Sequence, residues 1–253
     1  MLNSEKEKLS NYALRGYITK QNSSKLIFFL QAFGIILVVI GHANISGTWL
    51  RTWIYEFHMP LFMFISGFLM KYSLKTDYED VNLCEFIKKK LYRLLIPYFV
   101  INIIALYPKI LMNDFASRPV EVSWFGIIQS FIYPWDNTII FFWFLPTLFL
   151  IFVISASLLK LFKSDIPIII LMAVSIVCQI FNLEFTKFLN INGVIIYFSW
   201  WGFGYFYMIY EAKMKLMVDS HCLAFICFLG TLIPIYTEST ENFMYIFSIL
   251  GIL

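Results

Sequence analysis

The stretch FLQAFGIILVVIGH, Phe29 to His42, is followed after a short polar gap by FHMPLFMFISGFL, Phe57 to Leu69. Both are apolar runs, and a histidine stands at the end of the first and near the start of the second. Long apolar runs without charge are typical of transmembrane helices. The two runs therefore predict a pair of membrane helices, with His42 and His58 on either side of one short connecting loop.

The composition extends this interpretation to the whole chain. Of the 253 residues, 60% are hydrophobic, 20% are aromatic and only 14% are charged, and the mean hydropathy is +0.76. A soluble domain of this length needs far more charge to cover its surface. We therefore predict an all-α fold, a polytopic transmembrane helical bundle.

About eight apolar segments are expected to form spans, by length and hydropathy. They are residues 25–41, 58–70, 94–112, 139–159, 166–181, 194–210, 222–236 and 243–253. A further apolar stretch, residues 122–133, is too short to span and is expected to be re-entrant or interfacial.

The chain divides into a polar N-terminal segment, residues 1–24, and a transmembrane domain, residues 25–253. The last apolar run ends without polar flanking residues. We expect either a C-terminally shortened domain or a last helix that ends against other protein.

The basic residues predict the orientation, because Lys and Arg collect in cytoplasmic loops. With a cytoplasmic N-terminus, fifteen of the nineteen Lys and Arg residues fall on the cytoplasmic side. The four on the outer side are Arg51, Lys109, Arg118 and Lys187. The net charge of +3 thus follows topology, and we expect no nucleic-acid partner. His42 and His58 are placed near the outer face.

The four cysteines show no metal-ligand spacing. They are Cys84, Cys178, Cys222 and Cys227, and they lie mostly inside apolar segments. Cysteine behaves as a small hydrophobic residue in such places, so we expect buried thiols, and no metal site.

The two histidines are the first candidates for chemistry, since ionisable groups at membrane depth are rarely incidental. Histidine can take a proton from a hydroxyl nucleophile or accept an acyl group. Glu56, two residues before His58, would orient or charge-balance an imidazole. Interfacial histidines that are merely hydrogen-bonded are the alternative.

Gln31 and His42 share one helical stripe. They are eleven residues apart, which places them within about 20° on one face and about 16 Å apart along the axis. A polar residue at each end of a stripe favours a face turned toward the bundle interior. A helix-packing face with an incidental amide is equally compatible.

Two further sets of residues suggest ligand binding. In KKKLYRLLIPY, Lys88 to Tyr98, Lys90 and Arg93 at i and i+3 are suited to phosphates or a lipid head group, although the positive-inside rule also explains them. FFWFLP, which contains Trp143, and SWWGFGYF are suited to stacking on a sugar ring or to anchoring at the interface.

These fragments, taken in order, resemble the acyltransferase-3 family of integral membrane acyltransferases, which includes sugar and polysaccharide O-acetyltransferases. The resemblance rests on LVVIGH, FHMPLFMFISGFL, the K-x-x-R step before LLIPY, FWFLP and WGFGYF. It implies a bundle of about ten spans in the bacterial cytoplasmic membrane. It also implies acyl transfer from acetyl-CoA or another acyl-CoA to a hydroxyl, usually on a glycan.

The resemblance also implies roles for individual residues. His42 matches the family's histidine and is expected to be catalytic, as general base or transient acyl carrier. Lys90 and Arg93 match an arginine pair, and Gln31 stands where the family carries an arginine, without that residue's charged fork. We expect Gln31, Glu56, His58, Lys90, Arg93 and Trp143 to bind substrate.

The expected partners are membrane lipid and a carbohydrate acceptor. Three alternatives stay open: a non-catalytic relative, a transporter and a glycan polymerase. A transporter would show related halves with interrupted helices, and no such repeat is visible. A polymerase would carry long, arginine-bearing outer loops, whereas the outer loops here are short and poor in basic residues.

Overall fold

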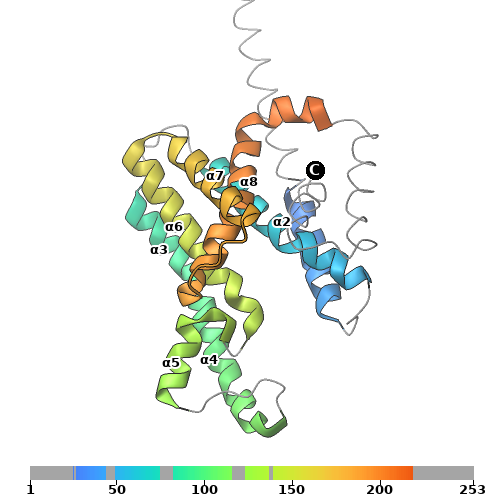
Figure 1. Ribbon diagram of the computed structural model, residues 1–253, viewed down its shortest axis with the longest axis vertical. Coiled ribbons are helices and arrows are strands. Elements are labelled where there is room, and N and C mark those ends of the chain that lie inside the picture. Colours follow the sequence, from blue (N-terminus) through green and yellow to red (C-terminus); the bar gives the residue numbers. More distant parts are fainter. Residues whose placement is uncertain are drawn as a thin grey trace, which may run out of the picture. The chain divides into compact units, whose positions relative to one another are not determined.

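The computed structural model describes residues 25, 27–43, 49–74, 82–115, 123–136 and 139–218, and the regular elements among them are all helical (Figure 1). This confirms the all-α expectation. The chain forms two compact units, residues 1–65 with 213–253, and residues 66–212. Each unit is described by itself below.

Three helices within the described residues are long and apolar enough to cross a membrane. They are Leu50–Ser73, Leu83–Leu111 and Phe141–Phe162. Two shorter apolar helices, Ile27–His42 and Ile166–Ile180, correspond to the first and fifth expected spans. The last two expected spans, 222–236 and 243–253, lie outside the described residues, so the structure supports a membrane helical bundle but does not establish eight spans.

Helix α2, Trp49–Ser73, corrects the expected start of the second span. The helix has 25 residues, and Pro60 lies inside it. The residues from Trp49 to Glu56, which precede the apolar run, are already helical, because hydropathy marks only the apolar part of a helix. His58 is therefore inside α2, more than two turns from its start, and not at the edge of a loop.

The helix Ile27–His42 packs antiparallel against the first part of α2. A Cβ at Gly34 would lie 2.9 Å from the Phe62 ring, and one at Gly41 would lie 3.1 Å from Ile54. Between these contacts Leu37 and Ile54 form a buried cluster. Small residues let membrane helices approach closely, so the two glycines explain why these helices pair along this face.

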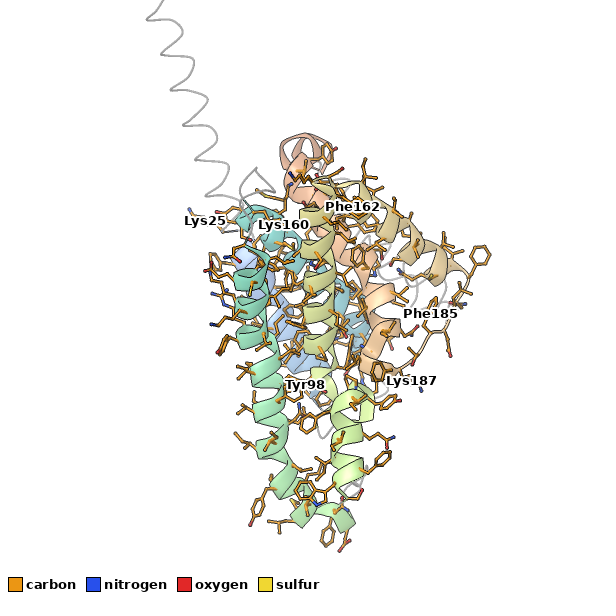
Figure 2. The ribbon with its side chains drawn as sticks, turned by 90° about the vertical axis from the view of Figure 1, so that its left-hand side faces the viewer. Lys25, Tyr98, Lys160, Phe162, Phe185 and Lys187 are labelled. Carbon is orange, nitrogen blue, oxygen red and sulfur yellow. The ribbon has the colours of Figure 1, made fainter. Side chains whose placement is uncertain are left out.

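The second unit is built around one long helical run and α6. The run comprises α3 (Leu83–Lys90), a π-helical turn η2 (Leu91–Leu95) and α4 (Ile96–Leu111). Helix α6, Phe144–Phe162, lies alongside α3 and η2 (Figures 1 and 2). Helix α4 presents exposed Ile103, Ile104, Tyr107 and Leu111. An exposed apolar face of this kind fits contact with lipid.

The remaining elements of the second unit are short helices and the pair α7 and α8. Helix α5, Trp124–Ile132, has nine residues, as expected of the stretch judged too short to span. The other elements are η3 (Asn113–Phe115), η4 (Pro134–Asp136), η5 (Ile140–Trp143), α7 (Ile166–Ile180), η6 (Phe188–Asn190) and α8 (Ile191–Val218).

Polar side chains join α7 to α8. The Gln179 amide donates to the hydroxyl of Ser199 and to the carbonyl of Ile196, each at 2.8 Å. Interhelical hydrogen bonds of this kind hold membrane helices together, where burial of apolar surface drives association little. Cys178 beside this amide is buried as expected, whereas Cys84 in α3 is exposed, so the expectation of buried thiols is wrong for Cys84.

Candidate functional site

Tyr55 connects the two histidines of the first unit. Its hydroxyl lies 3.0 Å from Nδ1 of His42, within hydrogen-bonding distance. Its ring centroid lies 5.0 Å from that of His58, in an edge-on arrangement. The sequence pointed to both histidines but not to Tyr55, although Tyr55 and His58 stand at i and i+3 on one helix, a spacing that places side chains side by side.

His58 is buried and its protonation is fixed by one contact. Its Nδ1 donates to the carbonyl oxygen of Ile54 at 2.8 Å. Because a carbonyl can only accept, Nδ1 must carry the proton. In the neutral ring Nε2 then has the free lone pair, so His58 presents a single tautomer.

His42 ends its helix and is exposed. When its Nδ1 donates the hydrogen bond to Tyr55, Nε2 carries the lone pair that a general base needs. His42 follows the apolar run that ends at Gly41, where partial burial, and secondarily the positive charge of Arg51, lower the pKa of His42 below its usual value. A lowered pKa keeps the imidazole neutral, and thus able to accept a proton, at neutral pH.

Arg51 completes this cluster. Its guanidinium carbon lies 5.1 Å from the centroid of the Tyr55 ring, a cation–π contact. Four side chains from the first helix pair, His42, Arg51, Tyr55 and His58, therefore gather at one place. The cluster offers two imidazoles, a hydroxyl and a fixed positive charge.

Gln31 and Glu56 are not seen at this cluster. Gln31 is half-buried on the edge of the packing face of its helix, whose buried stripe includes Ile27, Gly34, Leu37 and Gly41. At about 16 Å along the axis it is too far from His42 for contact. The side chain of Glu56 lies outside what the structure describes.

Lys90 and Arg93 point to different surroundings in the second unit. The Lys90 ammonium lies 3.5 Å from the ring centroid of Phe152 on α6 and 5.3 Å from that of Phe86. Arg93 is exposed and lies within the π-helical turn that begins directly after Lys90. A π-helical turn follows Lys90, so the two residues are not spaced as on a regular α-helix.

Trp143 is buried, at 8% exposure, so it offers little ring surface to a ligand. It stacks on Trp135 with ring centroids 4.9 Å apart and on Tyr197 at 5.3 Å. Trp135 is the open member of this stack, at 41% exposure. Trp135 was not a candidate from the sequence, because its contacts come from distant elements.

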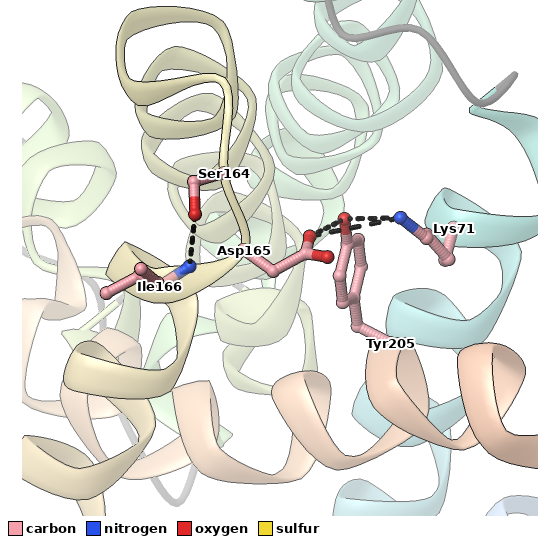
Figure 3. A network of polar contacts seen from close by, with 5 residues as sticks. All are labelled: Lys71, Ser164, Asp165, Ile166 and Tyr205. Atoms are coloured by element: carbon pink, nitrogen blue, oxygen red, sulfur yellow. Dashed lines mark hydrogen bonds and ion pairs between the residues drawn. The ribbon is translucent and has the colours of Figure 1, made fainter.

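A polar network links α2, the start of α7 and α8 in the second unit (Figure 3). The Tyr205 hydroxyl donates to Asp165 Oδ1 at 2.7 Å, and Lys71 Nζ donates to the same hydroxyl at 3.2 Å. Lys71 and Asp165 also form an ion pair at 3.8 Å. Tyr205 is fully buried, so its hydroxyl depends on these partners.

The comparisons with known proteins identify the family. One family model, described as an acyltransferase domain, matches residues 27–253. The match begins at the first apolar helix and includes the histidine cluster, Lys90, Arg93 and Trp143. Neither the curated proteins nor the solved structures gave a match. The chain belongs to the acyltransferase-3 family and is a membrane acyltransferase.

Proposed function

We propose that this acyltransferase moves an acyl group, in the simplest case acetyl, from acyl-CoA to a hydroxyl of a surface carbohydrate. It would work in the bacterial cytoplasmic membrane with its N-terminus in the cytoplasm. The observation that carries this proposal is the cluster of His42, Tyr55 and His58, which brings two imidazoles and a phenol hydroxyl together in the first helix pair.

The reaction needs a group that removes one proton. His42 Nε2 takes the proton of the acceptor hydroxyl while the hydroxyl oxygen attacks the thioester carbonyl carbon. The C–S bond then breaks, and the imidazolium returns its proton to the leaving thiolate, which gives an ester and free CoA. In the alternative order, the imidazole is acylated first and passes the acyl group to the hydroxyl.

Tyr55 and His58 support His42 in this proposal. The Tyr55 hydroxyl lies within hydrogen-bonding distance of Nδ1 and can orient the His42 ring, and when Nδ1 is the donor, Nε2 is the atom that accepts the proton. His58 packs edge-on against the same phenol, and its Nδ1–H bond to Ile54 leaves Nε2 as the acceptor atom, suited to binding the acceptor hydroxyl. We also propose that Glu56 binds substrate.

The donor phosphates are assigned to the basic residues of the second unit. Arg93 is exposed, and a guanidinium fork is suited to phosphate oxygens. Lys90 contributes a positive charge held over Phe152, and no carboxylate pairs with it among the described side chains. Gln31 contributes amide hydrogen bonds in place of the arginine that the family resemblance implies.

A non-catalytic relative is the second candidate, and Gln31 is the observation that favours it. An amide carries no charge, so it stabilises an anionic donor less than arginine does. If Gln31 abolishes donor binding, the chain binds its acceptor without acylating it.

One experiment separates these candidates. Cells that lack the gene are supplied with the native chain, His42→Ala, Gln31→Arg or the control His221→Ala, which removes the one histidine outside the cluster. The O-acyl content of the surface glycan is measured by mass spectrometry, and expression of each variant is checked in the membrane fraction.

We expect the native chain and His221→Ala to restore acylation. We expect His42→Ala not to restore it. Acylation that appears only with Gln31→Arg would instead identify a non-catalytic relative. Equal acylation by the native chain and His42→Ala would remove the proposed mechanism.

A further inference from the structure

The turn that carries Trp135 is held by buried side chains from two other elements of the second unit, α4 and η6. Tyr98 on α4 donates to the carbonyl of Phe131 at 3.3 Å, and Figure 2 shows Tyr98 between α4 and α5. One turn further along α4, the Asn102 side chain accepts from the backbone N–H of Ile139 at 3.1 Å. The turn is therefore fixed at both of its ends.

Asn190 holds Trp135 itself. Its Oδ1 accepts from the indole N–H of Trp135 at 2.9 Å, and its Nδ2 donates to the hydroxyl of Thr147 at 2.6 Å. Asn190 is 2% exposed and has a φ of 53°, a left-handed conformation that asparagine tolerates better than most residues. A Cβ at Gly193 would overlap the Asn190 amide, so glycine is required beside it. The amide is therefore packed in one orientation.

Trp135 is consequently a rigid aromatic surface with an open side. It lies almost parallel to the buried Trp143, at an interplanar angle of 17°, and still has 41% of its surface exposed. A ring that is pre-positioned in this way loses little freedom when it binds a ligand.

Anchoring at the membrane interface does not explain this arrangement. A tryptophan anchor places its apolar ring toward lipid and its N–H in the wet head-group layer. In Trp135 the N–H is already bonded to a buried asparagine, so the polar end is unavailable to water or head groups. The part of the indole that can still meet a ligand is its apolar ring surface.

We propose that the exposed ring surface of Trp135 is a subsite for one sugar ring of the acceptor, which stacks on the indole through its apolar C–H face. This inference rests on the proposed function and deepens it by naming the part of the molecule that holds the carbohydrate. Trp143, expected from the sequence to bind substrate, supports Trp135 from behind.

The place of Trp135 in the fold agrees with the proposed orientation. Lys160 and Phe162 lie at one end of α6, and Lys187, next to η6, lies toward the other (Figure 2). Trp143 and Thr147, the supports of the Trp135 turn, belong to that other end. With Lys160 in the cytoplasm, Trp135 is on the outer side, where a surface glycan arrives.

The test uses the full chain in lipid nanodiscs, with radiolabelled acetyl-CoA as donor. The acceptor is exopolysaccharide from cells that lack the gene, chemically O-deacylated. The variants are Trp135→Leu, which removes the ring, Trp135→Phe, which keeps a ring, and Trp124→Leu, which removes a tryptophan that is 85% exposed on α5. The measurements are KM for each substrate, kcat, and the melting temperature as a check on folding.

We expect Trp135→Leu to raise KM for the polysaccharide about tenfold, the size of one good aromatic contact. KM for acetyl-CoA stays unchanged, Trp135→Phe retains most of the affinity, and Trp124→Leu has no effect. An unchanged polysaccharide KM in Trp135→Leu overturns the inference. Equal effects of Trp135→Leu and Trp124→Leu, or equal rises in both KM values, also overturn it, because they indicate interface anchoring or general damage.

If no acyl transfer is detected at all, that result counts against the proposed function but not against the subsite. The subsite is then tested by a binding measurement. Calorimetric titration of the same polysaccharide into the native protein and Trp135→Leu is then decisive. Weaker binding by Trp135→Leu supports the subsite, and equal binding or none by the native chain overturns it.

Discussion

At the scale of residues, the central observation is that Tyr55 brings His42 and His58 into one cluster. The sequence predicted both histidines because ionisable groups are conspicuous in apolar segments. It could not predict Tyr55, since tyrosine is common near span ends and only the packing of two helices places its hydroxyl on His42. The fixed tautomer of His58 likewise depends on a backbone contact that no pattern of residue types reveals.

Removing the Tyr55 hydroxyl tests its role as a positioning residue. We expect Tyr55→Phe to lower kcat for acyl transfer about fivefold while KM for acetyl-CoA stays unchanged, because the lost hydrogen bond, worth about 1 kcal/mol, orients the base. The control is Tyr107→Phe, whose ring is 71% exposed on α4. A kcat that matches the native value would show that Tyr55 only packs against the imidazoles.

The charge of Arg51 gives a prediction about pH. Because burial and Arg51 lower the pKa of His42, the acidic limb of the kcat/KM profile should lie below pH 6.5. Arg51→Gln removes the repulsion of the imidazolium, so the pKa rises and the limb moves to higher pH. The profile of the control Lys109→Gln should not move. A limb that stays in place in Arg51→Gln would contradict an effect of the Arg51 charge on the titrating base.

At the scale of elements, apolar runs predicted the helices well where hydrophobicity defines both ends. Helix α7, Ile166–Ile180, was expected at 166–181, and α6, Phe144–Phe162, at 139–159. Hydropathy failed at the start of α2, where polar residues continue the helix. It also could not show the π-helical turn Leu91–Leu95, because a change in hydrogen-bond spacing leaves composition unaltered.

The network of Lys71, Tyr205 and Asp165 should stabilise the junction of three helices. Tyr205→Phe removes the hydroxyl that bridges the two charged groups, and hydrogen bonds to charged groups contribute about 1.5–3 kcal/mol. We expect a melting temperature lower by several degrees in nanodiscs, with little change in KM for either substrate. Tyr210→Phe on the same helix, where the ring is 50% exposed, is the control. Equal melting temperatures for the native protein and Tyr205→Phe would show that the network contributes nothing to stability.

At the scale of the whole molecule, the functional groups come from two compact units. The histidine cluster belongs to residues 1–65, and the basic residues and the Trp135 subsite belong to residues 66–212. Composition and order of motifs were enough to predict a membrane protein of this family. The Trp135 subsite was not predictable, because its supports come from α4 (Tyr98 and Asn102) and η6 (Asn190), which are far apart in the sequence.

The orientation makes a prediction of its own. In a cysteine-free background, Lys163→Cys should react with a membrane-impermeant maleimide only from the cytoplasmic side, and Lys187→Cys only from the outer side. Both positions are exposed, so access does not limit the reaction. Labelling in the reverse pattern would show that the chain has the opposite orientation in the membrane. The proposed path of the acyl group would then be wrong.

The most direct test of the account is acyl transfer by the purified chain. Native protein, His42→Ala and His221→Ala are placed in nanodiscs with radiolabelled acetyl-CoA and O-deacylated exopolysaccharide, and label in the polysaccharide is counted. We predict transfer by the native protein and His221→Ala, and a loss of about 100-fold or more in a folded His42→Ala protein. Undiminished transfer by His42→Ala would contradict the proposal that His42 is the catalytic base.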